Sequence, residues 1–151
     1  MAPSVALIAL ANTFLSHFCS LDMDQMLSIR TSDCVQVIGP ASMDRPAMDN
    51  AAFRSAYGSV LRHFRSMSME TKSILTDTER NVVVLHVQSR ATTIGPRYDM
   101  EYIFILHATA DAKALNRIEE FIDSATAKTQ WTQLQEAIVA LEEMKHVPNA
   151  Q

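Results

Sequence analysis

The hydrophobic pattern of this chain changes its period near residue 69, and that change limits the folds available to it. Before this point, apolar residues recur every three or four positions, as on the buried face of a helix. After it, β-branched residues gather in four extended runs, residues 69–76, 81–92, 97–109 and 115–123. Helices followed by a run of strands are typical of an α+β protein whose helices cover one face of an antiparallel sheet.

Three helices are expected ahead of the strands. The first covers residues 3–20, and Asp22 is a suitable cap for the second. A third helix follows Asp49, and its apolar face extends to Phe64. After the strands, one more helix is expected from a single apolar stripe, formed by Trp131, Leu134, Ile138 and Leu141.

A short strand is expected over residues 33–38, where Gly39-Pro40 ends it. The loop that follows, residues 41–49, is expected to lie over the mouth of a pocket. Three helices cannot fill the hollow of a wide curved sheet. The pattern therefore predicts a cavity between sheet and helices, which is the ordinary place for a small ligand.

Size and composition restrict the organisation and the partners. A chain of 151 residues is expected to form one domain, residues 1–146, with residues 147–151 as a flexible tail. The net charge is −4 and the basic residues are scattered, so nucleic acid is not expected as a partner. The uncharged segment 1–21 is interrupted by polar residues, so no membrane segment is expected, and the predicted location is cytoplasmic.

Motifs for bound groups are missing from the sequence. It contains two cysteines and three glycines, without zinc-ligand spacing, a P-loop, a dinucleotide-binding motif or a nucleophile elbow. Neither a metal nor a cofactor is therefore expected. Chemistry in an apolar pocket then means moving protons, with a carboxyl group whose pKa is raised by loss of solvent as the acid or base.

Four segments of the sequence resemble one known family. Residues 30–34 (RTSDC) and 39–43 (GPASM) resemble the segment after the second helix in fungal NTF2-like (SnoaL-like) isomerases and cyclases of meroterpenoid biosynthesis. Residues 93–102 (TIGPRYDMEY) and 117–124 (RIEEFIDS) resemble the same family's turn, Glu-Tyr strand and acidic strand. The similarity follows the family's order over most of the chain.

This resemblance implies a cone in which a curved antiparallel sheet wraps around N-terminal helices, with a pocket between them. It also implies an isomerase, cyclase or dehydratase acting on a polycyclic terpenoid or polyketide intermediate of fungal secondary metabolism. Two positions depart from the family, because Gln36 stands where relatives often carry His and Met100 where they tend to have Asn. A different reaction, or a binding or dimeric assembly protein without catalysis, is the alternative.

Glu120 is the first candidate for the acid or base. It shares one face of the last strand with Ile118 and Ile122, whereas Glu119 lies on the other face. The resemblance also implies that this position points into the cone. A carboxylate in solvent or in an ion pair is the alternative role for Glu120.

The strand before it has two candidate faces. One carries Tyr102, a possible hydroxyl donor to substrate; the other carries Glu101, which would form an acid–base pair with His86 if it lined the pocket. Arg30 is expected to bind a substrate carboxylate or, as a structural role, to pair with Asp33 or Glu120. The residues expected to bind an apolar substrate are Phe53, Tyr57, Tyr98, Phe104, Leu106, Ile118 and Ile122.

Apolar residues on both faces of the predicted sheet leave one face that the helices do not cover. A second copy of the chain is expected to cover it, which predicts a homodimer.

Overall fold

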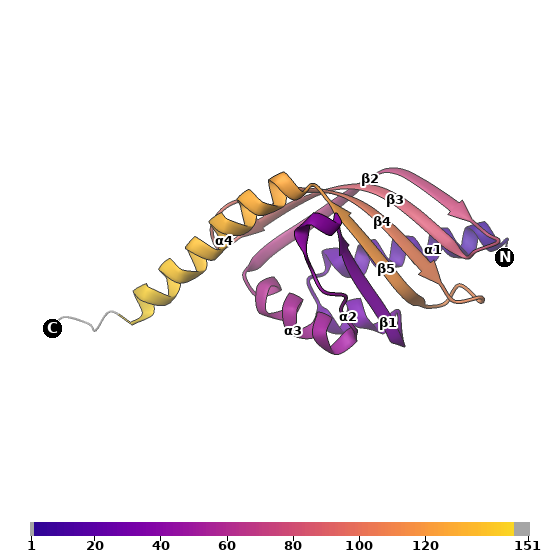
Figure 1. The fold of residues 1–151 in the computed structure, drawn as a ribbon, viewed down its shortest axis with the longest axis horizontal. Coiled ribbons are helices and arrows are strands. Elements are labelled where there is room, and N and C mark those ends of the chain that lie inside the picture. The colour runs from indigo at the N-terminus through magenta and orange to yellow at the C-terminus, as the bar shows by residue number, and fades with distance from the viewer. Residues whose placement is uncertain (1, 147–151) are drawn as a thin grey trace.

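The computed structural model describes residues 2–146, so the tail expected at residues 147–151 lies outside the described residues. The predicted order of helices, strands and a last helix is confirmed (Figure 1). The helical elements are α1 (Pro3–Cys19), α2 (Met23–Ser28), the single turn η1 (Ala41–Met43), α3 (Asn50–Leu61) and α4 (Ser124–Lys145). The strands are β1 (Arg30–Gly39), β2 (Phe64–Asp77), β3 (Val82–Thr93), β4 (Met100–Ala108) and β5 (Leu115–Ile122).

Aspartate side chains begin three of the helices. Asp22 accepts hydrogen bonds from the first backbone N–H groups of α2, Asp49 does so for α3, and Asp123 for α4. These caps satisfy N–H groups that have no partner within the helix. The caps of α2 and α3 are those expected from the sequence, whereas the Asp123 cap of α4 was not predicted.

The five strands form one curved sheet in the order β1-β5-β4-β3-β2. Strands β2 to β5 form the expected antiparallel meander. The expectation of a wholly antiparallel sheet is wrong at one edge, because β1 pairs with β5 in parallel. A parallel neighbour needs a long connection, and the whole chain from α3 to β4 supplies it here.

The boundary between α3 and β2 also differs from the prediction. The helix ends at Leu61, and Phe64 is the first residue of β2 rather than part of the helical face. The strand thus starts five residues earlier than the sequence pattern indicates. A register shift between Phe64 and Ser66 explains the difference, because a bulge interrupts the alternation that marks a strand.

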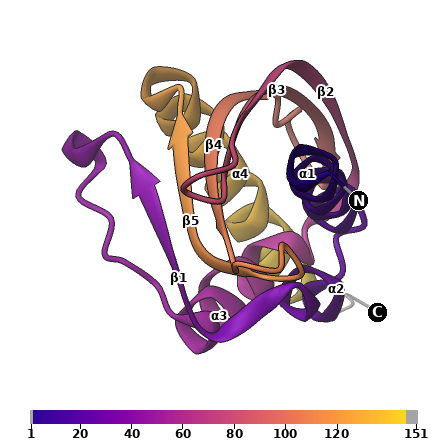
Figure 2. The ribbon, with the colours of Figure 1, turned by 90° about the vertical axis from the view of Figure 1, so that its right-hand side faces the viewer.

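Helix α1 lies within the curl of the sheet, beside β2 and β3 (Figure 2). Its apolar side contributes Phe14 and Phe18, whose rings contact that of Phe104 on β4. Leu85 pairs with Phe104 across β3 and β4, in the same register as the isolated bridge between Thr92 and Arg97. The core therefore fills the narrow part of the cone, between α1 and the middle strands.

Helix α4 follows β5 and extends away from the sheet (Figure 1). Of its expected apolar stripe, Leu134 is fully buried, whereas Trp131, Ile138 and Leu141 are half-buried. Over residues 2–146, none of the helices combines the length and the apolar character needed to cross a membrane.

Candidate active site

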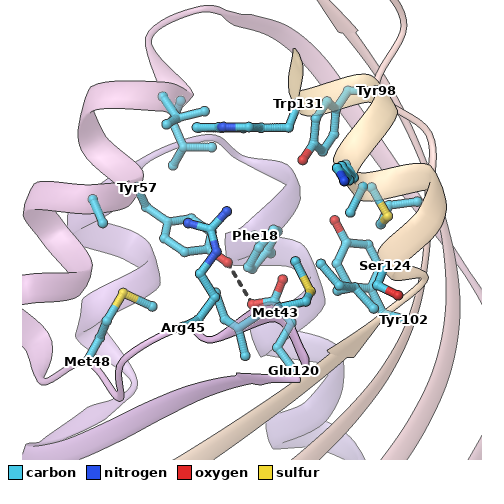
Figure 3. Close-up of a pocket in the computed structure, with 18 of the residues that line it drawn as sticks. Phe18, Met43, Arg45, Met48, Tyr57, Tyr98, Tyr102, Glu120, Ser124 and Trp131 are labelled. Carbon is cyan, nitrogen blue, oxygen red and sulfur yellow. Dashed lines mark hydrogen bonds between the residues drawn. The ribbon is translucent and has the colours of Figure 1, made fainter. Parts of the chain in front are cut away.

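The wide end of the cone contains a cavity of about 760 Å³. Its wall combines side chains from every layer of the fold, among them Phe18 of α1, Tyr57 of α3, Tyr102 of β4, Glu120 of β5 and Trp131 of α4 (Figure 3). Most lining residues are apolar or aromatic, and a few polar groups point inward. This composition is typical of a site for one small molecule.

Glu120 is the buried carboxyl group of this cavity. Its position between Ile118 and Ile122 turns it to the inner face of β5, where only 4% of the residue is exposed. One oxygen, Oε2, accepts a hydrogen bond from the Tyr57 hydroxyl at 2.7 Å (Figure 3). The same oxygen accepts a second hydrogen bond from the Gln36 Nε2 at 2.6 Å. Burial raises the pKa of Glu120, although both donors and the charge of Arg30 favour its ionised form.

Arg30 lies behind Glu120 and does not pair with it directly. Its NH2 group donates to the Gln36 Oε1 at 2.6 Å, so the amide of Gln36 separates the cation from the carboxyl group. The guanidinium carbon also lies 3.8 Å from the centre of the Phe53 ring, a cation–π contact. The expected pairing of Arg30 with Asp33 or Glu120 is therefore replaced by a contact through Gln36.

Three tyrosine hydroxyls belong to the same cavity. Burial raises the pKa of Tyr102 and of Tyr57 well above the ordinary value, and the charge of Glu120 adds to this effect. For Tyr98, burial raises the pKa to about 12. All three hydroxyls are therefore protonated at neutral pH; the proton of Tyr57 is donated to Glu120, whereas Tyr98 and Tyr102 can donate hydrogen bonds to an oxygen of a bound molecule.

The other residues expected to bind substrate divide into two groups. Tyr57, Tyr98 and Ile122 line the cavity. Fully buried core residues form the second group, which lies behind the cavity wall: Phe53, Phe104, Leu106 and Ile118. Phe53 stacks on Tyr57 with ring centres 4.4 Å apart, so this group shapes the wall from behind.

Glu101 and His86 lie on the opposite, outer face of the sheet. The His86 Nε2 is 2.5 Å from the Glu101 Oε1, and both residues are partly exposed. A similar pair, His107 and Glu119, lies on the same face at 2.8 Å. The structure therefore turns the Tyr102 face of β4 to the cavity and does not bring the His86–Glu101 pair there.

Several residues of the site were not singled out as functional by the sequence pattern. Gln36 is fully buried on the inner face of β1. Its spacing of two residues from the apolar Cys34 and Ile38 was the sequence signal that could have placed it on this face. The loop after β1 lines the cavity and contributes Arg45 and Met48. Within residues 2–146, no group of three His, Cys, Asp or Glu side chains is arranged to hold a metal ion.

Two proteins of Penicillium brasilianum are similar to this chain in sequence. Austinoid biosynthesis clusters protein F is 30% identical over 125 residues, which are 81% of this chain and 83% of that protein. Austinoid biosynthesis clusters protein J is 30% identical over 121 residues, 78% of this chain and 70% of that protein. The chain belongs to this fungal NTF2-like family. The resemblance carried by residues 30–43 and 93–124 is thereby confirmed.

Solved structures show that this NTF2-like chain has the SnoaL-like cone fold. BvnE pinacolase of Penicillium brevicompactum superposes with a TM-score of 0.82 at 24% identity, over 90% of this chain and 98% of that one. PrhC of Penicillium brasilianum has the same TM-score of 0.82 at 24% identity and covers 93% of both chains. A Shewanella denitrificans protein described as a SnoaL-like polyketide cyclase reaches 0.68 at 11% identity, over 86% of this chain and 97% of that one. No protein-family model matches the sequence.

Proposed function

We propose that this NTF2-like protein is an enzyme of fungal secondary metabolism that isomerises, cyclises or dehydrates a polycyclic terpenoid or polyketide intermediate. The observation that carries the proposal is Glu120, a carboxyl group 4% exposed in the wall of a mostly apolar cavity. Burial raises its pKa, and an acid with a raised pKa can both give and take a proton near neutral pH. The reaction then needs no group beyond those of this chain.

The cavity suits a bulky apolar molecule. Its volume of about 760 Å³ is within the range of pockets for drug-sized ligands. Four methionines are among the lining residues, Met43, Met48, Met67 and Met100. Thioether side chains adapt to irregular shapes, so these residues suit a bulky substrate of irregular outline.

The proton step follows from the positions of the polar groups. Glu120 takes a proton from one atom of the substrate and returns it to another, so the substrate changes its bonding without net gain or loss of a proton. Tyr102, which lines the same cavity, donates a hydrogen bond to a substrate oxygen and stabilises negative charge that develops there. In a dehydration, protonated Glu120 instead gives its proton to the hydroxyl, which leaves as water. The resulting carboxylate takes a proton from the adjacent carbon as the C=C bond forms, so Glu120 is protonated again.

The names of the relatives support the pathway class. Two proteins with 30% identity are named for austinoid biosynthesis, and a pinacolase has the same fold. Sequence identity to the pinacolase is 24%, so this similarity is evidence for the fold alone. The proposed reaction is argued from the cavity and from Glu120.

The test compares two neighbouring glutamates. Glu120→Gln keeps the shape of the side chain but cannot transfer a proton, and we expect turnover of the pathway intermediate to fall by about 10²-fold to 10⁴-fold. Glu119→Gln is the matched control, because Glu119 lies on the outer face, 2.8 Å from His107. Its turnover is expected to stay within about twofold.

The assay feeds the pathway intermediate to the purified protein in deuterated water and follows the product by mass spectrometry. Deuterium at one carbon of the product reports the proton transfer. Unchanged turnover by the Glu120→Gln protein would remove this carboxyl group from the mechanism. Binding of the intermediate with no conversion by the wild-type protein would instead identify a binding protein.

We also propose that the protein is a homodimer formed through the outer face of the sheet. On this face Ile103 and Ile105 of β4 are half-buried, and Phe121 of β5 is 53% exposed. The helices cover the other face, so a second copy is the partner that brings an equal apolar surface.

A further inference from the structure

Gln36 lies next to Glu120 but has no role in the proton transfer proposed above. The residue is fully buried on β1, between the guanidinium of Arg30 and the carboxyl group of Glu120. Its backbone is held on one side by Met48, to which its N–H donates at 2.8 Å and from which its carbonyl accepts at 2.9 Å, and on the other side by pairing with Ile118 of β5. The side chain therefore leaves a fixed point of the strand.

The orientation of this amide follows from its neighbour. A guanidinium group has hydrogen-bond donors and no acceptor, so the atom of Gln36 that meets Arg30 must be the oxygen. The Nε2 group consequently faces Glu120 and can only donate to it. Arg30 thus determines that Gln36 is the donor and Glu120 the acceptor in the hydrogen bond between them.

Both donors meet the same oxygen of Glu120. Gln36 and the Tyr57 hydroxyl donate to Oε2, and the raised pKa of Tyr57 keeps its proton in place. No hydrogen bond from the described residues reaches the other oxygen, Oε1, although Glu120 lines the cavity. An oxygen that accepts two hydrogen bonds is a poor place for an added proton, so the acid proton of Glu120 belongs on Oε1.

We propose that Gln36 is a positioning residue that connects the charge of Arg30 to Glu120 Oε2 and thereby reserves Oε1 as the atom that exchanges the proton with substrate. This inference rests on the proposed function, because it names the working atom of the same carboxyl group. Other charged or titratable groups that line the same cavity as Glu120 are Tyr98, Tyr102, Arg45 and Lys128. They are unaltered in the variants described next.

Two variants separate the donor role of Gln36 from its packing. Gln36→Glu has the same shape and still accepts from Arg30, but an ionised carboxylate cannot donate to Glu120. Gln36→Leu keeps a similar volume and removes both hydrogen bonds. In each case the ionised form of Glu120 loses a donor, so we expect the pKa of Glu120 to rise above that of the wild-type protein. Cys34→Ala, on the same face of β1, is the packing control and should leave that pKa unchanged.

The measurement is an NMR titration of protein labelled with ¹³C at the glutamate side chains, in which Glu120→Gln assigns the signal of Glu120. A midpoint that is the same in wild type, Gln36→Glu and Gln36→Leu would overturn the proposal. A midpoint that moves equally in Cys34→Ala would overturn it too, because packing alone would then explain the effect.

A second reading uses the wild-type protein, so the test survives if the variants do not fold. The chemical shifts of the Gln36 Nε2 protons are expected to change with pH at the same midpoint as the shift of the Glu120 carboxyl carbon. Nε2 proton shifts that stay constant through this midpoint would refute the hydrogen bond. Neither titration involves a substrate. Failure of the proposed function appears separately, as unchanged turnover by Glu120→Gln.

Discussion

Two adjacent glutamates on β5 show how strongly position decides the chemistry of a side chain. Glu120 faces the cavity and is buried, so its pKa is raised, mainly by loss of solvent. Glu119 faces outward, where hydrogen bonds from His107 and Arg117 lower its pKa. The alternation of a strand alone separates these environments, since both residues have the same ionisable group.

The raised pKa of Glu120 makes stability depend on pH in a defined direction. Below the ordinary pKa of a glutamate, the folded and unfolded states both hold the proton, so the group has no effect on the free energy of unfolding. As the pH rises from that value through the raised pKa, the unfolded chain ionises first and the folded protein loses stability. The loss is about 1.4 kcal/mol for each tenfold change in the ionisation constant.

Glu120→Gln is expected to remove this loss, so the variant gains free energy of unfolding relative to wild type as the pH increases through this window. Urea unfolding of both proteins at a series of pH values measures the difference. Parallel curves would mean that Glu120 ionises in the folded protein as it does in the unfolded chain.

At the scale of the elements, α4 completes the cavity with its first half. Ser124, Lys128 and Trp131 line the cavity, whereas Val139 and Met144 further along are 53% and 74% exposed. The helix therefore binds to the cone mainly through its first turns, next to its cap.

Asp123→Ala tests the contribution of this cap. The carboxylate accepts hydrogen bonds from the backbone N–H groups of Ala125 and Thr126 and from the Thr126 hydroxyl. Its removal is expected to lower the free energy of unfolding by about 1 kcal/mol and to weaken binding of an apolar ligand, because the cavity loses part of its wall. Urea unfolding and ligand titration measure the two effects, and Asp123→Asn, which retains an acceptor, should restore most of both.

The sequence was most informative where one short signal decides an element. Aspartate caps located the starts of α2 and α3, and alternation placed Glu120 on the inner face, whereas the choice between the Tyr102 and Glu101 faces of β4 stayed open until the structure decided it. The start of β2 was missed because a bulge hides its alternation. Pairing of β1 with β5 joins strands about 80 residues apart, and no turn between them records it.

The sequence pattern also could not distinguish residues that line the cavity from residues that are buried in the core behind it. Alternation assigns Phe104, Leu106 and Ile118 to the inner face, yet they lie in the core, because α1 fills that part of the cone. Gln36 was noticed as a departure from the family and not as a site residue. Its contacts to Arg30 and Glu120 depend on the parallel register of β1, which the sequence did not reveal.

At the scale of the whole molecule, the uncovered face of the sheet predicts the oligomeric state. Wild-type protein at micromolar concentration is expected to have the mass of a dimer in light scattering. Ile105→Lys places a charge at the centre of this face and should shift the mass to that of a monomer, whereas Ile105→Val should remain a dimer. A monomeric wild-type protein would contradict the proposed interface.

The hydrogen bonds to Glu120 also bear on how the protein is made. Glu120 lies 84 residues after Gln36 and 63 residues after Tyr57, so the acid is synthesised long after the groups that tune it. Contacts between such distant segments require closure of a long loop, so they are expected to form later than contacts between neighbouring segments. A nascent or partly unfolded chain thus contains an ordinary glutamate, and catalytic activity in denaturant should disappear together with the global structure rather than before it.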